Sequence, residues 1–249
     1  MRYLIISDVH LRWKIANKII KKEKKNYDKV LFLGDYMDDF GAWPNDYVEI
    51  CKWLKDNLND ENKIFLLGNH DIAYYSSYNL VLGEVHYYRC SGYSDNWKRI
   101  IQDYLSLDDW KKIKLYYFIN DNTLCTHAGL TNQLYTQLKI GNVKEYFNTE
   151  ENILLSRIEK NFAPGLMIGV GKSRGGLNEV GGITWCDYND DFKTVNGLNQ
   201  IFGHTVLYPD PQYIIYNDGH FDLALDTHNR HYALYNTENN KMIIKNFDI

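Results

Sequence analysis

The sequence has few of the residues that define disulfide-bonded or membrane-spanning proteins. Only 4 of its 249 residues are cysteine, and none forms a Cys-x-x-Cys pair. This spacing excludes a dense disulfide framework and favours reduced thiols in a cytoplasmic protein. No apolar run is long enough to span a membrane. A strand-like segment begins within a few residues of Met1, so we also expect no signal peptide.

An excess of positive charge is also missing. The chain has 28 Lys and Arg against 32 Asp and Glu, a net charge of -4. We therefore expect no general attraction to nucleic acid, although binding of a specific nucleotide stays open. Hydrophobic residues make up 45% of the chain, which is enough for a sizeable core. We expect residues 1–249 to form a single domain.

The sequence does contain short apolar runs that end abruptly in polar residues. The central example is residues 30–33, which lead through Gly34 into Asp35. A short run that is apolar on both faces indicates a buried parallel strand. Glycine lets the backbone turn sharply at the end of that strand. The Asp35 carboxylate is then expected at the C-terminal edge of the sheet, where open α/β folds bind their ligands.

Four more apolar runs end in carboxylate, amide or imidazole side chains: Asp8 and His10, then Asn69, His70 and Asp71, then His127, and finally His204. One such strand end would mean little, because these residues also stabilise turns. Five strand ends of this kind indicate a metal site, since the side chains are hard or borderline ligands that need no cysteine to complete the set.

The connections between the first strands have helical periodicity. Residues 15–25 and 46–58 carry apolar side chains at helical spacing, and Asp46 with Glu49 resembles a capping box. The resulting order β-α-β-α-β through residue 67 predicts a parallel sheet with right-handed crossovers.

Two insertions follow Asp71. Residues 72–120 are rich in aromatic side chains, with a helical pattern over 97–117 and a cap at Ser106. These aromatic rings either form the small core of the insertion or stack a nucleobase beside the site. The segment 131–182 is first mostly helical and ends in a loop with seven of the 17 glycines.

The last part of the chain is rich in short strand patterns, at residues 213–216, 221–226, 231–235 and 241–247. Asn-rich turns separate them. We therefore predict a second sheet, mixed or antiparallel, packed against the first, with helices flanking both.

The ordered motifs resemble the signature of calcineurin-like metallophosphoesterases. They are Asp8-x-His10, Gly34-Asp35-x-x-Asp38, Gly68-Asn69-His70-Asp71, His127-Ala128-Gly129 and Gly203-His204. The closest branch is that of the phosphoprotein phosphatases and symmetrical dinucleoside tetraphosphatases, because Val206 stands where the nuclease-like branch has a second histidine. The resemblance implies an α/β fold, a four-layer αββα sandwich of two mixed sheets, with a helical insertion over the active site.

The resemblance also implies two divalent metal ions, which we expect to be Mn²⁺, with Fe or Zn²⁺ as alternatives. Asp35 would bridge the two ions. The other ligands would be Asp8 and His10 on one ion and Asn69, His127 and His204 on the other. Two such ions neutralise the charge of a phosphate and lower the pKa of a bridging water that attacks phosphorus.

His70 is the expected general acid, because it follows a metal ligand and would protonate the leaving oxygen. A catalytic histidine needs a partner that sets its tautomer. Asp38 matches the family position for this role, and Asp71 is a less favoured alternative.

The substrate-binding residues depart from the family pattern. Asp39 stands where the phosphatase branch usually has an arginine, and its negative charge would repel phosphate. Arg12, or Arg174 in the glycine-rich loop, would compensate, with Asn69 as a further substrate contact.

Three functions remain open. The first is a phosphatase acting on a phosphoprotein or a small phosphorylated metabolite. The second is hydrolysis of a nucleotide anhydride or diester, which the aromatic insertion favours. The third is a non-catalytic metal-dependent binding protein, for which Asp39 is the only argument.

Overall fold

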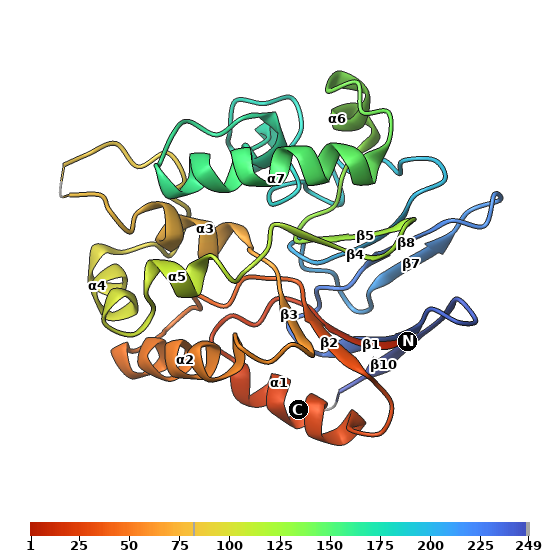
Figure 1. The fold of residues 1–249 in the computed structure, drawn as a ribbon, viewed down its shortest axis with the longest axis horizontal. Coiled ribbons are helices and arrows are strands. Elements are labelled where there is room, and N and C mark those ends of the chain that lie inside the picture. The colour runs from red at the N-terminus through yellow and green to blue at the C-terminus, as the bar shows by residue number, and fades with distance from the viewer. Residues whose placement is uncertain (82, 248–249) are drawn as a thin grey trace.

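The structure is a computed structural model that describes residues 1–81 and 83–247. Two five-stranded sheets lie face to face, and helices cover their outer faces (Figure 1). The first sheet has the order β10 (Lys241–Asn246), β9 (His231–Asn236), β1 (Arg2–Ile6), β2 (Lys29–Phe32) and β3 (Lys63–Phe65). The second has the order β4 (Tyr116–Asn120), β5 (Thr123–Thr126), β6 (Asn199–Phe202), β8 (Phe221–Ala224) and β7 (Gln212–Ile215).

Both sheets are mixed, as the family resemblance implies. The last two predicted strands, however, join the first sheet and not the second, because β9 pairs with β1 and β10 with β9. In the first sheet β1, β2 and β3 are parallel, while β9 and β10 are antiparallel additions at one edge. In the second sheet β5, β6 and β8 are parallel, and β4 and β7 pair antiparallel at the two edges. Three parallel strands in each sheet therefore bring their C-terminal ends to one edge of the sandwich.

The side chains of β1 alternate between two cores. Tyr3 and Ile5 pack between the sheets, whereas Leu4 and Ile6 pack with the helices on the outer side. All four are buried. This period of two explains why the strand is apolar throughout, because both of its faces are covered.

The helices form the outer layers and one end of the molecule. Helices α1 (Trp13–Glu23) and α2 (Pro44–Asn57) cover the first sheet. On the second sheet lie α6 (Asn132–Gln137) and α7 (Val143–Glu159) (Figure 1). At one end are α3 (Asn69–Ser76), α4 (Asp95–Tyr104) and α5 (Leu107–Trp110). The four-layer αββα expectation is confirmed.

Two local expectations are wrong in part. The helical pattern over residues 97–117 is confirmed as far as α4 and α5, but residues 116–120 instead pair with β5. Helix α2 begins at Pro44, two residues before the expected cap. Asp46 lies in its first turn and accepts a hydrogen bond from the Trp43 N–H at 2.8 Å. The expected cap at Ser106 is confirmed, since its hydroxyl accepts from the Asp109 N–H.

The glycine-rich segment 164–182 is a loop, as expected, with two short 3₁₀ turns, η1 (Leu166–Ile168) and η2 (Lys172–Arg174).

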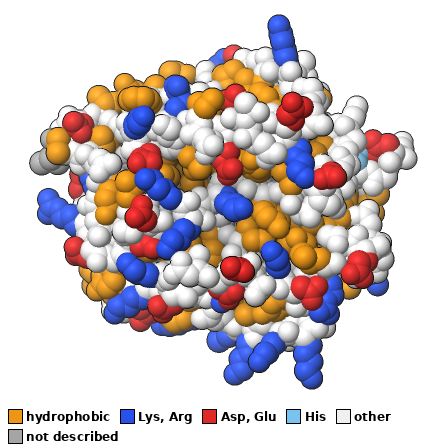
Figure 2. Space-filling view, viewed as in Figure 1, with side chains coloured by type: hydrophobic (Ala, Val, Ile, Leu, Met, Phe, Trp, Pro, Cys, Tyr) orange, Lys and Arg blue, Asp and Glu red, His pale blue; other side chains and the backbone are white. Residues whose placement is uncertain are grey.

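The four cysteines all lie among the described residues and are free thiols. Within residues 1–81 and 83–247, no helix combines the length and apolarity that crossing a membrane requires. On the face shown in Figure 2, Lys and Arg side chains lie among Asp and Glu side chains.

Candidate metal centre

The polar strand ends of both sheets meet at one place. Four residues that the sequence singles out there have a left-handed backbone: His10, Asp35, Asp38 and His204. Positive φ is uncommon for residues other than glycine and is concentrated at functional sites. The strand ends are therefore sharply turned, which aims several polar side chains at a common point.

Asp35 lies at the centre of this arrangement. Its carboxylate belongs to two groups of potential metal ligands, one with Asp8 and His10 and the other with His127 and His204. Within each group the ligand atoms lie within 4.8 Å of one another. A carboxylate shared by two ligand groups is the arrangement needed to bridge two cations.

His127 places one ring nitrogen among several polar atoms of the site. Its ring is fully buried, and Nδ1 lies 2.9 Å from the Leu33 carbonyl, which can only accept, so Nδ1 carries the proton. Nε2 of the neutral ring is then an acceptor. It nevertheless faces Asn69 Oδ1 at 3.0 Å, His204 Nδ1 at 3.2 Å and Asp35 Oδ2 at 3.3 Å. His204 Nδ1 can donate to this nitrogen as one tautomer, and a bound metal ion would stabilise the lone pairs of all four atoms together.

The pKa values of His127 and Asp35 show the effect of the charges that face each other in the site. Burial by itself lowers the pKa of His127, but the Asp35 and Asp8 carboxylates raise it to about 9. Burial likewise opposes ionisation of Asp35, and the surrounding histidines outweigh it and hold the Asp35 pKa below its ordinary value. The carboxylates therefore favour positive charge at this position, as a site for divalent cations must.

The second half of the site is built around His10 and Asp8. His10 Nδ1 donates to the Asp38 carbonyl at 2.7 Å, which leaves Nε2 free 3.6 Å from Asp35 Oδ2. Asp8 accepts from the Ser7 hydroxyl and from the His204 N–H. A methyl group at Gly203 would collide with Asp8 Oδ2, so glycine is required for this close approach. Hydrogen bonds of this kind fix the orientation of metal ligands.

His70 and Asp38 form a pair at the edge of the site. His70 Nδ1 lies 2.8 Å from Asp38 Oδ2. Burial lowers the pKa of His70, but Asp35 and the bond to Asp38 raise it well above its ordinary value. Asp71, the alternative partner, accepts instead from the backbone N–H groups of Tyr36 and Gly68. Its carboxylate thereby joins the backbones of the Asp35 and Asn69 motifs.

The two candidate arginines are both paired with carboxylates. Arg12 forms a two-pronged ion pair with Asp39, at 2.9 and 3.1 Å. Arg174 Nε lies 2.7 Å from Asp187, and its Nη2 donates to Thr205. Asp39 is therefore neutralised by a residue that the sequence predicts to bind phosphate.

Sequence reasoning missed the residues that support the ligands from outside the motifs. Asn229 donates to the Asp8 carbonyl at 2.8 Å, although 221 residues separate them. Tyr47 and Tyr74 donate to Asp38. Their sequence patterns indicate only buried helix faces, and no local signal distinguishes a tyrosine that packs from one that also donates to a site carboxylate.

The sequence model of the calcineurin-like phosphoesterase family matches residues 1–208, and the chain belongs to this family. The protein is therefore a metal-dependent hydrolase of phosphoric esters. None of the curated proteins matches the chain significantly.

Solved structures of low sequence identity share the fold. A cold-active protein-tyrosine phosphatase of a psychrophilic Shewanella species is 16% identical with a TM-score of 0.60, covering 98% of this chain and 77% of the other. A Saccharomyces cerevisiae protein serine/threonine phosphatase is 16% identical with a TM-score of 0.50, covering 100% and 80%. A structure provisionally assigned as a diadenosine tetraphosphatase is 15% identical with a TM-score of 0.52, covering 98% and 93%.

Proposed function

We propose that the protein is a cytoplasmic phosphatase that uses two divalent metal ions to hydrolyse phosphomonoesters. The observation that carries this proposal is the Asp35 carboxylate shared between two ligand groups. Oxygen and nitrogen donors suit Mn²⁺, our first choice by family analogy, and also Fe and Zn²⁺.

In this proposal Asp35 would be the ligand shared by two ions. Asp8 and His10 would hold one ion with it, and Asn69, His127 and His204 would hold the other. When bound, two divalent ions neutralise the phosphate charge and activate a water molecule. The ring hydrogen bonds of His10 and His127 to backbone carbonyls keep Nε2 of each free to coordinate.

His70 acts as general acid and protonates the oxygen of the departing alcohol or phenol. Its Nδ1 is held by Asp38, so Nε2 can present the proton to the leaving group. Replacement by asparagine removes the proton donor without changing a metal ligand. We expect His70→Asn to keep the metal content of the wild type and to lower turnover by about 10²-fold or more. Unchanged turnover would refute this role.

Arg174, Arg12 and Asn69 are the proposed substrate contacts. Arg174 retains donors beyond those that bind Asp187 and Thr205, because a guanidinium has five N–H groups. Arg12 has its fork occupied by Asp39, so it contributes less charge to an incoming phosphate than an unpaired arginine would.

A nucleotide or another aromatic phosphoester is the second candidate substrate. Most of the aromatic insertion gives it little support, since Tyr74, Tyr75 and Tyr88 are buried in a core and Tyr87 is the half-exposed exception among these four. Two exposed rings that follow Asp38 in the sequence favour it instead. Phe40 is fully exposed and Trp43 is 73% exposed, both a few residues beyond Asp38. Such rings could stack on an aromatic group.

The non-catalytic hypothesis loses its argument, because Asp39 is paired with Arg12 and so does not present an uncompensated charge.

A substrate panel tests the two enzymatic candidates. We would compare p-nitrophenyl phosphate, bis-p-nitrophenyl phosphate and a dinucleoside tetraphosphate, each with Mn²⁺ and with EDTA. Mn²⁺-dependent preference for the monoester supports the proposal. Preference for the diester or the dinucleotide favours the second candidate, and no turnover of any with two metals bound would refute both.

A further inference from the structure

Asp38 is a buried carboxylate with three side-chain donors. The hydroxyls of Tyr47 and Tyr74 both donate to Oδ1 at 2.6 Å. His70 Nδ1 lies 2.8 Å from the other oxygen, Oδ2. Each oxygen of the carboxylate thus has its own kind of partner.

This division has a chemical consequence for His70. Two hydroxyl donors on Oδ1 stabilise the negative charge of Asp38 in a buried place without introducing a competing positive charge. A lysine or arginine in their place would pair with Asp38 itself and weaken its hold on the imidazole. With Oδ1 occupied, Oδ2 remains directed at Nδ1, and the ring of His70 keeps one orientation.

Aromatic rings of the insertion, to which Tyr74 itself belongs, pack on both tyrosines. The Tyr47 ring stacks on Trp97 of α4, with centroids 4.6 Å apart. The Tyr74 ring packs on Tyr93 at 5.1 Å. Both tyrosines are almost fully buried, so their hydroxyls have little freedom to turn away from Asp38. The insertion therefore restrains the donors as well as forming its own core.

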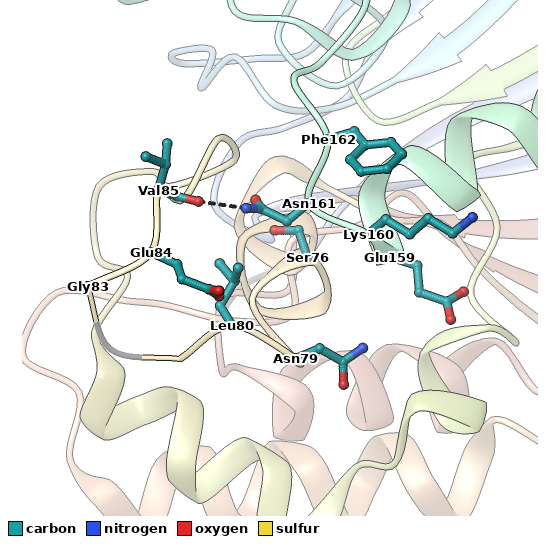
Figure 3. A pocket seen from close by; sticks show the side chains of 10 residues that line it. All are labelled: Ser76, Asn79, Leu80, Gly83, Glu84, Val85, Glu159, Lys160, Asn161 and Phe162. Atoms are coloured by element: carbon teal, nitrogen blue, oxygen red, sulfur yellow. Dashed lines mark hydrogen bonds between the residues drawn. The ribbon is translucent and has the colours of Figure 1, made fainter.

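The backbone of the insertion also lies directly against Asp38. Gly92 has φ of +89°, and a Cβ placed on it would lie 3.0 Å from both Cβ and Cγ of Asp38. The segment before Gly92 is anchored at its other end by Asn161, which follows α7. Asn161 Nδ2 donates to the Val85 carbonyl (Figure 3). Its Oδ1 accepts from the Tyr87 N–H.

The geometry points to Tyr47 and Tyr74 as positioning residues for catalysis, which act through Asp38 to hold His70 as proton donor. This inference rests on the role proposed above for His70. It gives the aromatic insertion a function in the reaction itself, distinct from contact with the substrate.

Tyr47→Phe, Tyr74→Phe and the double variant test the inference, because phenylalanine keeps the ring and removes only the donor. The assay compares kcat on phenyl phosphate with kcat on p-nitrophenyl phosphate, whose more acidic leaving group depends less on a general acid. On phenyl phosphate we expect each single variant to lose about tenfold in kcat, and the double variant more. The loss on p-nitrophenyl phosphate should be smaller, with KM and bound Mn²⁺ unchanged.

Tyr75→Phe is the matched control. Tyr75 is a buried tyrosine of α3, the helix that carries Tyr74, and its ring stacks on Trp110. Removing the Tyr75 hydroxyl should leave kcat on both substrates unchanged. A second route leaves both tyrosines intact: Gly92→Ala crowds Asp38 and should change the leaving-group dependence in the same direction.

The same substitutions in a His70→Asn background separate the possible failures. If the inference holds, removing the tyrosine hydroxyls there causes no further loss. If His70→Asn is impaired and the double phenylalanine variant is not, the inference is overturned and the proposed acid stands. If His70→Asn itself keeps full turnover, the proposed acid falls, and the inference with it. Equal losses on both substrates would assign the tyrosines a merely structural role.

Discussion

Gly68→Ala is a sharp steric test of the proposed metal centre. Gly68 precedes α3 with φ of -91°, a conformation that alanine adopts without strain. The added Cβ, however, would lie 2.7 Å from Cγ of Asp35 and 2.5 Å from its backbone nitrogen, and closer still to Oδ1. Carbon atoms in contact normally lie about 3.5–4.0 Å apart. The Asp35 carboxylate must therefore retreat by roughly 1 Å.

A displacement of this size exceeds what metal coordination allows. Ligand distances are normally held to about 0.2 Å. Because Asp35 is shared by both ligand groups, both sites lose their common ligand. We expect Gly68→Ala to bind fewer than two Mn²⁺ ions and to lose about 10²-fold or more in kcat/KM, the usual effect of a misplacement of about 1 Å.

The assay is metal content after gel filtration, followed by kcat/KM on p-nitrophenyl phosphate. Gly141→Ala is the matched control, because it has no positive φ and nothing lies within 4 Å of its added Cβ. Far-ultraviolet circular dichroism should show that both variants fold. Two Mn²⁺ ions and full activity in Gly68→Ala would refute the central position that we assign to Asp35.

Three further predictions concern metal binding, a substrate contact and a buried carboxylate of α5. EDTA should lower Tm and Mn²⁺ should restore it, because occupancy at about 1,000 times the dissociation constant stabilises by about 4 kcal/mol per site; an unchanged Tm contradicts metal binding by the folded state. Arg174→Ala should raise KM for a phosphomonoester more than it lowers kcat, and an unchanged KM removes Arg174 from the substrate contacts. Burial alone raises the pKa of Asp109, but bonds from Ser106 and the ammonium groups of Lys112 and Lys55 lower it to about 2. Its contribution of about 2 kcal/mol is then complete above pH 4 and lost as pH falls toward 2. Urea unfolding of Asp109→Asn should lack that part of the pH dependence, and an identical pH dependence contradicts the assignment.

Much of the fold is predictable because local patterns and burial agree. The runs that end at Asp8, Asp35 and Asn69 are apolar on both faces. A strand needs this pattern only when both of its faces are covered. Their crossovers have helical periodicity, so a parallel sheet follows. The end of the segment 97–117 departs from its predicted helical pattern for the opposite reason. Its last residues have a mixed pattern, and pairing with β5, a long-range interaction, decides that they form a strand.

The candidate site divides in a similar way. The types of ligand and their order can be predicted from the sequence, since each motif follows a strand end and parallel strands place those ends together. The ion pairs of the residues around the site cannot be predicted in this way. Arg12 pairs with Asp39, and Arg174 with Asp187, through loops whose approach no local pattern specifies.

The sequence by itself determined the fold class, the family resemblance and the set of residues from which a metal site can be built. Only the tertiary structure decided that Arg12 pairs with Asp39 and that Tyr47 and Tyr74 both donate to Asp38. The physical reason is the difference between short-range and long-range interactions along the chain. Strand and helix patterns arise from neighbours a few residues apart, whereas a hydrogen bond between side chains depends on ångström-scale placement by packed elements far apart in the chain.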